Sequence, residues 1–182
     1  MTFEELDIAG VYLITPQFIG DDRGGFFRYY CREEFAAITT SEFVQMNHSI
    51  NHQKGTLRGL HYQLPPHSEE KVVRCIHGSI QDVFVDLRAG SPTFLKWSSV
   101  QLSAANRKIL FLPKGIAHGF ITLEDHTELL YQHSAYYAPD FERGIHFSDP
   151  RLNIQWELEA SVVSDRDRSH PTLDEHFNGL IL

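Results

Sequence analysis

Short runs in which apolar and polar residues alternate recur along the middle of the chain and predict β-strands. Residues 71–88 contain two such runs, which meet at Gly78, and in the second run Val83 alternates with its neighbours Asp82 and Phe84. A period of two places successive side chains on opposite faces of a strand. We therefore predict a β-hairpin over residues 71–88, with a different set of side chains on each face.

Similar runs follow at short intervals, separated by turn-forming residues, at 94–103, 107–113, 117–124 and 127–137. Many short strands spaced about 8 to 12 residues apart are typical of a β-sandwich or barrel. No helix of about ten residues lies between successive runs, so parallel crossover connections are not expected. The pattern predicts an all-β jelly roll, and the mouth of such a fold is the expected place for a ligand.

Few segments indicate helix, and none indicates a domain boundary. Residues 31–38 are the one convincing helical stretch, and the segment after Asp149-Pro150 is mixed and is expected to wrap around the barrel. No low-complexity linker, heptad run or internal repeat interrupts the 182 residues. We expect one domain over residues 1–182, with a few short peripheral helices.

The charge balance narrows the possible partners. Sixteen Lys and Arg stand against 24 Asp and Glu, for a formal net charge of -8, which argues against a nucleic-acid binder. No segment approaches the roughly 20 apolar residues that cross a bilayer, and the first residues lack a signal-peptide pattern. Cys31 and Cys75 show no C-x-x-C spacing, so neither a disulfide scaffold nor a zinc ribbon is expected. We expect a cytoplasmic protein without a membrane or nucleic-acid partner.

Eleven histidines are the unusual feature of the composition, and His61 lies in the densest polar cluster of a β-rich segment. If residues 56–63 form one regular strand, His61 and Gln63 share one face, and Arg58 and Tyr62 share the other. A histidine in this position is either a group for proton transfer near neutral pH or a residue that is merely hydrogen-bonded at a strand end.

His118 lies between glycines at the start of another strand. One interpretation of His61 and His118 is that they bind a metal. A mononuclear site in a small β-barrel usually has two histidines close together in one strand, with a carboxylate and a third histidine nearby. The His-Tyr-Gln sequence that begins at His61 lacks that pair. A metal-dependent enzyme, such as a dioxygenase or a sugar isomerase, would have to use His61, His67, Glu70 and His118.

Two further groups of residues, three tyrosines and a run of charges, do not by themselves indicate a function. Tyr131, Tyr136 and Tyr137 lie in or just after an apolar strand, where aromatic residues more often pack than react. Residues 164–168 form a charge run that predicts a solvated surface segment.

In their order along the chain, these segments resemble the dTDP-4-dehydrorhamnose 3,5-epimerase family from about residue 10 to about residue 173. The motifs that carry the resemblance are DDRGGFF, QMNHS, GTLRGLHYQLPP, EKVVR, DVFVDLRAGSPTF, LPKGIAHGF, ELLYQ and SDRD. The resemblance implies a cupin-type double-stranded β-helix that forms a homodimer and uses neither a metal nor a cofactor. It also implies an isomerase that epimerises C3, C5 or both of a nucleotide-diphosphate 4-keto-6-deoxyhexose in deoxysugar biosynthesis.

The resemblance implies a role for each matching residue. His61 is the base, Asp167 the carboxylate that orients it, Tyr131 the acid on the other side of the sugar, and Lys71 the cation near the carbonyl oxygen. The residues at substrate-binding positions of the family are Arg23, Phe26, Gln45, Asn47, Ser49, Arg58, His118, Tyr137, Glu142 and Arg166. Arg23 is expected to reach the nucleotide site of a neighbouring subunit.

The chain departs from the family at several positions near the expected nucleotide site. Arg28 replaces a usual glutamate, His146 a frequent arginine, Phe147 a usual tryptophan, and Arg166 a usual lysine. A cation cannot make the hydrogen bonds of an acceptor. The sequence therefore leaves open whether thymidine or cytidine diphosphate is recognised and whether one or both carbons are inverted. A sugar-binding jelly roll without catalysis is a third possibility.

Overall fold

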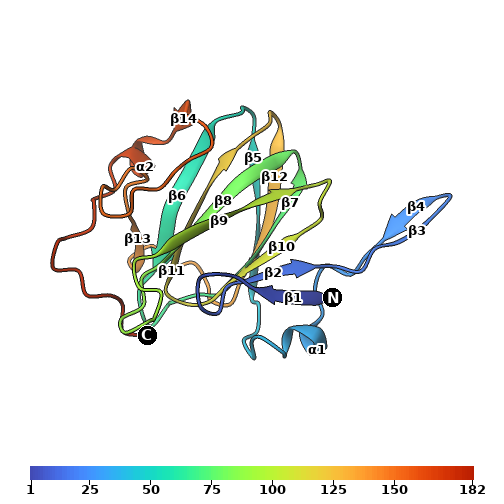
Figure 1. Ribbon diagram of the computed structural model, residues 1–182, viewed down its shortest axis with the longest axis horizontal. Coiled ribbons are helices and arrows are strands. Elements are labelled where there is room, and N and C mark those ends of the chain that lie inside the picture. The colour runs from blue at the N-terminus through green and yellow to red at the C-terminus, as the bar shows by residue number, and fades with distance from the viewer.

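The computed structural model describes all 182 residues, and strands form most of its regular structure (Figure 1). The first sheet has the strand order β1 (Thr2–Glu5), β2 (Tyr12–Thr15), β10 (Ile109–Leu112), β7 (Lys71–His77), β12 (Thr127–His133) and β5 (Gln45–Asn51). The second sheet has the order β13 (Glu142–Gly144), β6 (Thr56–Gln63), β11 (Ile116–Thr122), β8 (Ser79–Asp86) and β9 (Trp97–Ser103), with β14 (Val162–Val163) parallel to β6.

The all-β jelly roll expected from the sequence is confirmed. From β5 to β8, consecutive strands alternate between the two sheets, and the neighbours within each sheet pair antiparallel, apart from β14. Helix is confined to two single turns, α1 (Arg32–Phe35), which lies inside the predicted stretch 31–38, and α2 (Asp165–Arg168). No helix has the length and apolar character needed to cross a membrane.

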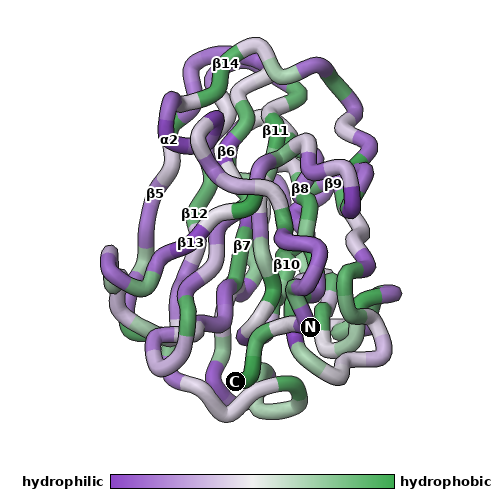
Figure 2. The backbone as a smooth tube through the Cα atoms, turned by 90° about the vertical axis from the view of Figure 1, so that its left-hand side faces the viewer, coloured by the Kyte–Doolittle hydropathy of each residue, from purple (hydrophilic) through white to green (hydrophobic).

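Strand β8 explains how the core is divided. Every residue of β8 is buried, although its sequence alternates. Ile80 and Phe84 pack with Val73 of the first sheet, in the cluster between the sheets, whereas Val83 belongs to an outer cluster that includes Leu180 from the end of the chain. Figure 2 shows hydrophobic stretches along the central strands β7 and β8. The C-terminal segment therefore wraps around the outside of the second sheet, as predicted.

The predicted hairpin over residues 71–88 is wrong. Strand β7 belongs to the first sheet, where it pairs with β10 and β12, while β8 belongs to the second, where it pairs with β11 and β9. Gly78 forms the corner between them with a φ of +72°, and a Cβ there would lie 2.4 Å from Thr127 Oγ1. Alternation predicts both strands correctly, but it carries no information about which strands pair.

The predicted faces of the strand over residues 56–63 are also wrong in part. Between the pairs His61–His118 and Arg58–Phe120, β6 advances three residues while β11 advances two, so β6 carries one extra residue. This irregularity lies at Gly59, whose φ is +127°. Such an extra residue changes which side chains share a face. Arg58 consequently reaches the first sheet, where its Nε donates to Asn51 Oδ1 at 2.7 Å.

A two-stranded hairpin, β3 (Ile19–Asp21) and β4 (Gly24–Phe26), projects from the two sheets (Figure 1). It pairs with no other strand, and all six of its residues are exposed. Ile19 and Phe26 expose 62% and 66% of their surface. Apolar side chains on a projecting hairpin mark a surface that another molecule can cover.

Candidate functional site

A polar pocket of about 160 Å³ opens between the sheets. Its lining is contributed mainly by β5, β7 and β12 of the first sheet and by β6 of the second. The lining residues are Gln45, Asn47, His61, Tyr62, Gln63, Glu69, Lys71, Tyr131, His133, Tyr137 and Glu142. His61 and Gln63 both line this pocket, but so does Tyr62, which strict alternation placed on the other face.

His61 is paired with a carboxylate that comes from far along the chain. Its Nε2 lies 2.6 Å from Oδ1 of Asp167, which belongs to α2. Ser164 caps this helix by accepting from the Asp167 N–H at 3.1 Å, which fixes the turn that carries the carboxylate. Burial raises the pKa of Asp167, but the hydrogen bonds from His61 and Ser164 outweigh burial and lower it. A charged Asp167 therefore holds the Nε2 proton and leaves the other ring nitrogen as an acceptor.

Tyr131 lines the same pocket from β12, on the sheet that faces His61. Burial raises the pKa of its hydroxyl, the charge of Arg58 opposes this shift, and the charge of Glu69 adds to it. The phenol is therefore protonated at neutral pH and can donate a proton. The two walls of the pocket thus carry a histidine that can accept a proton and a tyrosine that can give one.

Lys71 belongs to a buried cluster on the first sheet. Its Nζ lies 3.2 Å from Glu69 Oε1, and the second carboxylate oxygen, Oε2, lies 2.7 Å from His133 Nδ1. Burial raises the pKa of Glu69, but the charge of Lys71 and the contact with His133 lower it overall. The lysine therefore presents a positive charge that is held in place by a charged carboxylate.

Two predicted binding residues, His118 and Ser49, are buried outside the pocket lining. His118 Nε2 lies 2.9 Å from Asp82 Oδ1 in a pair that is almost fully buried, and burial raises the pKa of Asp82. Ser49 is buried on β5 and accepts from Asn51 at 3.3 Å. Arg58, which is exposed on β6, contacts the same asparagine through its Nε.

The pocket rim is formed by hydrogen-bonded polar groups. Gln45 accepts from the Tyr137 N–H at 3.0 Å and donates to Asn47 at 3.2 Å. The Tyr137 hydroxyl donates to Glu142 at 2.6 Å, and Glu142 also pairs with Arg166. Burial raises the pKa of Glu142, but the bonds from Tyr137 and Arg166 lower it. Asn47 also contacts a distant segment, since its Nδ2 lies 3.2 Å from His133 Nε2, so all of these rim residues are fixed by contacts between separate segments.

Arg23 and Phe26 do not reach the pocket of their own chain. Both line the surface of the β3–β4 hairpin, where Arg23 pairs with Asp21 at 2.6 Å. Arg28, one of the departures from the family, pairs with Glu34 at 2.9 Å in the same region. The hairpin thus separates two predicted binding residues from the other twelve site residues.

Sequence reasoning missed four pocket residues and one neighbour of the base. The four are Tyr62, Gln63, Glu69 and His133, of which Gln63 and His133 follow from strand alternation, since each lies two residues from a predicted site residue of the same strand. The neighbour of the base is His170, whose ring lies 5.4 Å from the ring of His61 and whose Nε2 is 3.4 Å from Asp167 Oδ1. The charge run at residues 164–168 offered no signal for it.

The metal ligand set proposed as an alternative is not brought together. His67 packs against Phe141, and Glu70 accepts from Thr39 at 2.6 Å, so neither side chain joins the two histidines of β6 and β11. One group of side chains has the proximity of metal ligands, and it consists of His61, Asp167 and His170.

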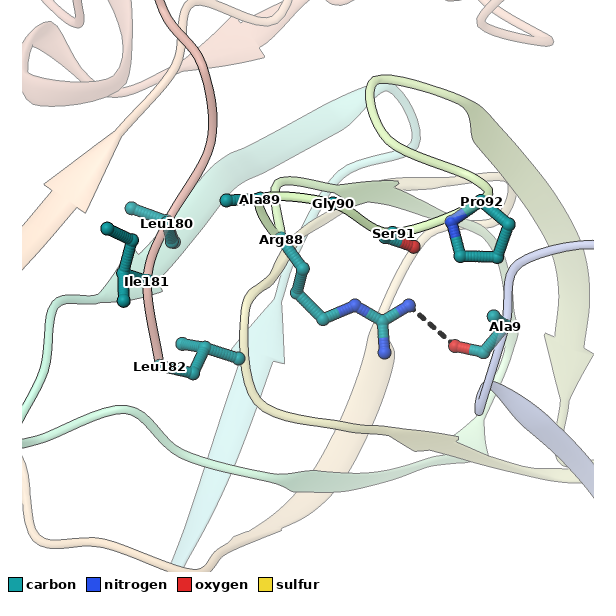
Figure 3. Close-up of a pocket in the computed structure, with 9 residues that line it drawn as sticks. All are labelled: Ala9, Arg88, Ala89, Gly90, Ser91, Pro92, Leu180, Ile181 and Leu182. Atoms are coloured by element: carbon teal, nitrogen blue, oxygen red, sulfur yellow. Dashed lines mark hydrogen bonds between the residues drawn. The ribbon is translucent and has the colours of Figure 1, made fainter.

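A second, larger cavity of about 530 Å³ lies beside the loop that follows β8 and the C-terminus (Figure 3). Its one charged lining side chain is Arg88, which already donates to Asp86 at 2.7 Å and to the Ala9 carbonyl at 2.6 Å. The cavity therefore has no charged group free for catalysis, and the smaller pocket is the candidate active site.

Comparison with known proteins agrees with this geometry. The family model that matches describes dTDP-4-dehydrorhamnose 3,5-epimerase and covers residues 5–175. The dTDP-4-dehydrorhamnose 3,5-epimerase of Shigella flexneri is 44% identical over 92% of this chain and 93% of its own. The crystal structure of the Bacillus anthracis dTDP-4-dehydrorhamnose 3,5-epimerase, with TDP and PPi bound, has a TM-score of 0.92 and 40% identity over 94% of this chain and 99% of its own.

A solved structure with a narrower activity is also similar. It is a 3'-monoepimerase from Streptomyces bikiniensis in complex with dTDP-quinovose, with a TM-score of 0.85 and 34% identity over 92% of this chain and 85% of its own. The resemblance inferred from the sequence motifs is therefore confirmed over nearly the whole chain.

Proposed function

The chain belongs to the dTDP-4-dehydrorhamnose 3,5-epimerase family, and from this premise we propose that it inverts both C3 and C5 of dTDP-4-dehydro-6-deoxyglucose. It is an isomerase of nucleotide-linked 4-keto-6-deoxyhexoses. Thymidine diphosphate and double inversion are proposed because relatives with at least 40% identity carry the name 3,5-epimerase, while the monoepimerase is more distant.

One observation carries the proposed mechanism: His61, paired with Asp167 at 2.6 Å, shares a pocket with Tyr131 of the opposite sheet. The ring nitrogen of His61 that Asp167 does not contact accepts the proton from the carbon next to the C4 ketone. The electron pair of the broken C–H bond moves to the C4 oxygen and forms an enolate. Asp167 stabilises the imidazolium that results.

Lys71 and Tyr131 complete the inversion. The ammonium group of Lys71 stabilises the negative oxygen of the enolate, because an aligned charge in a buried site is stronger than one in water. Tyr131 then donates its proton to the other face of the carbon, which leaves a tyrosinate that regains a proton from solvent. A single base could not deliver a proton to both faces without turning the substrate over.

The remaining predicted residues are proposed to hold the substrate. Rim and supporting groups would contact the sugar and the diphosphate, and these are Gln45, Asn47, Ser49, Arg58, His118, Tyr137, Glu142 and Arg166. Arginine side chains suit phosphate oxygens because they donate several hydrogen bonds in one plane.

Arg23 and Phe26 are proposed to act in the pocket of a second copy of the chain. This homodimer is supported by the projecting hairpin and by its exposed Ile19 and Phe26. Mixing the variants Arg23→Ala and His61→Ala tests it, because each mixed dimer would contain one complete site. Random pairing should restore about a quarter of wild-type activity. If Arg23 acts within its own chain, mixing restores nothing.

Deuterium exchange tests the chemistry. The protein is incubated in deuterated water with dTDP-4-dehydro-6-deoxyglucose and, in parallel, with its cytidine-linked analogue, and proton NMR follows C3 and C5. We expect exchange at both carbons of the thymidine sugar and none in His61→Ala. Tyr131→Phe should still exchange but fail to invert at one centre at least. Exchange at C3 alone would instead support a monoepimerase, and no exchange with either sugar would refute the function.

The cysteines support a cellular compartment, and the core supports a single domain. Cys31 and Cys75 are both free, which supports a reducing compartment such as the cytoplasm.

Residues 1–182 are proposed to form one domain, because the C-terminal segment covers the outer face of the sheet that carries His61.

A further inference from the structure

Three side chains that commonly bind metals converge beside the pocket, and the proposed reaction uses only two of them. Each of His61, Asp167 and His170 offers one possible ligand atom within 4.8 Å of those of the other two. The distance to Asp167 Oδ1 is 2.6 Å from His61 and 3.4 Å from His170. No step of the epimerisation requires His170.

His170 is partly buried beside Asp167, and its Nε2 lies 3.4 Å from Asp167 Oδ1 without making an aligned hydrogen bond. Its side chain is 12% exposed, and its Nε2 is buried without a hydrogen-bond partner. Buried polar atoms are nearly always paired, so an unpaired one indicates a strain or a missing ligand. The ring lies against Gly144, where a Cβ would be 2.3 Å from its Nε2, and the His146 N–H donates to the Pro171 carbonyl at 2.9 Å.

We propose that His61, Asp167 and His170 form a binding site for Zn²⁺ and that the bound metal switches off the catalytic base. Two imidazole nitrogens and one carboxylate oxygen are common zinc ligands, with bonds of about 2.0 to 2.2 Å. Ligand atoms of such a tetrahedral ion lie about 3.3 Å apart. The distance of 3.4 Å between His170 Nε2 and Asp167 Oδ1 already fits a tetrahedral ion. The distance of 2.6 Å between His61 Nε2 and Asp167 Oδ1 has to widen by less than about 1 Å.

A surface depression of about 400 Å³ opens beside His170 and is also lined by Glu142, Arg143 and Arg166. Arg166 and Arg168 flank Asp167 along the chain, and Arg166 is paired with Glu142. Asp167 supplies the negative charge that attracts a cation to the site.

Zinc binding and proton abstraction exclude each other. A bond from the metal to His61 uses the lone pair of Nε2, so the one proton of the neutral ring moves to Nδ1. Nδ1 then carries a hydrogen and cannot accept the proton of the sugar. This inhibitory effect rests on the function proposed above, whereas the binding itself does not.

Titration of metal-free protein with ZnCl2 tests the binding, with Co²⁺ as a spectroscopic substitute. We expect one Zn²⁺ per chain by calorimetry and a visible absorption band with Co²⁺. His170→Phe keeps a ring against Gly144 and should weaken Zn²⁺ binding more than about tenfold, since it removes a direct ligand. His170→Ala serves the same purpose if the phenylalanine does not fold. His48→Ala, which removes an exposed histidine paired with Glu128 at 2.9 Å, should bind as the wild type does.

Deuterium exchange in the presence of Zn²⁺ tests the inhibition. We expect exchange to fall as the site fills in the wild type, and to persist at the same Zn²⁺ concentration in His170→Phe. Equal Zn²⁺ affinity in wild type and His170→Phe would overturn the site. Full exchange by zinc-saturated protein would overturn the inhibition. A protein that binds Zn²⁺ through His170 but exchanges no sugar proton would refute only the proposed function.

Discussion

Asp86, the last residue of β8, gives a prediction whose size follows from its contacts. Its carboxylate accepts hydrogen bonds from Arg88 Nε at 2.9 Å, Ser91 Oγ at 2.5 Å and Thr93 Oγ1 at 2.6 Å. Burial raises the pKa of Asp86, but these bonds outweigh burial and lower the pKa from 3.8 to about 2. The native fold therefore stabilises the charged form.

The lowered pKa converts into a stability that depends on pH. Each tenfold change in acidity is worth about 1.4 kcal/mol, so the charged Asp86 contributes roughly 2 kcal/mol to folding at neutral pH. A group with a lowered pKa stabilises the fold fully above its unfolded pKa. The contribution should begin to fall below about pH 4, reach about half near pH 3, and vanish below pH 2.

Thermal unfolding of Asp86→Asn, followed by circular dichroism at fixed chain concentration, measures this contribution. At pH 7 the Tm should fall by about 4 to 8 °C, and the difference from wild type should shrink as the pH is lowered through 3. Asp22→Asn, at an exposed position, serves as the control and should leave Tm unchanged. A variant that unfolds at the wild-type temperature at pH 7, or whose deficit is as large at pH 3, would show the reasoning to be wrong.

Three other substitutions test the site. Gly144→Ala adds a Cβ that would lie 2.3 Å from the ring of His170. It should lower the free energy of unfolding, measured in urea, by about 1 to 3 kcal/mol, and an unchanged midpoint of urea unfolding would contradict this packing. Gly59→Ala, at a φ of +127°, should lose at least about 2 kcal/mol in the same assay, and a stable variant would argue against the extra residue in β6. Arg58→Gln removes a positive charge that lowers the pKa of Tyr131, so ultraviolet difference titration should show that this phenol ionises at a higher pH than in the wild type. An unchanged titration would show that Arg58 does not act on the Tyr131 hydroxyl.

Local signals in the sequence predicted the strands well. Alternation located β7 and β8, and the residues around His61 and Lys71 pointed to the pocket. Pairing could not be predicted from alternation, because the corner at Gly78 sends β7 and β8 to different sheets. The face of Arg58 could not be predicted either, because one extra residue in β6 is invisible to a pattern with a period of two.

Contacts between distant residues were beyond the residue pattern alone. Asp167 was identified as the partner of His61 only through the family resemblance, since 106 positions separate them and a charge run resembles any solvated surface. His133 and Glu69 were missed although each shares a strand face or lies two positions from a predicted residue. His170 became visible only when Gly144 and α2 were placed in space.

The distance along the chain between His61 and Asp167 has a consequence for biosynthesis. Strands β6 and β11, which form the wall that carries His61, emerge from the ribosome well before α2, which supplies the carboxylate. A nascent chain can therefore assemble the sheets while its histidine still lacks a partner. Only the last part of the polypeptide completes the dyad, so a product truncated before residue 164 would lack the carboxylate partner of His61 and also the segment that covers the outer face of the second sheet.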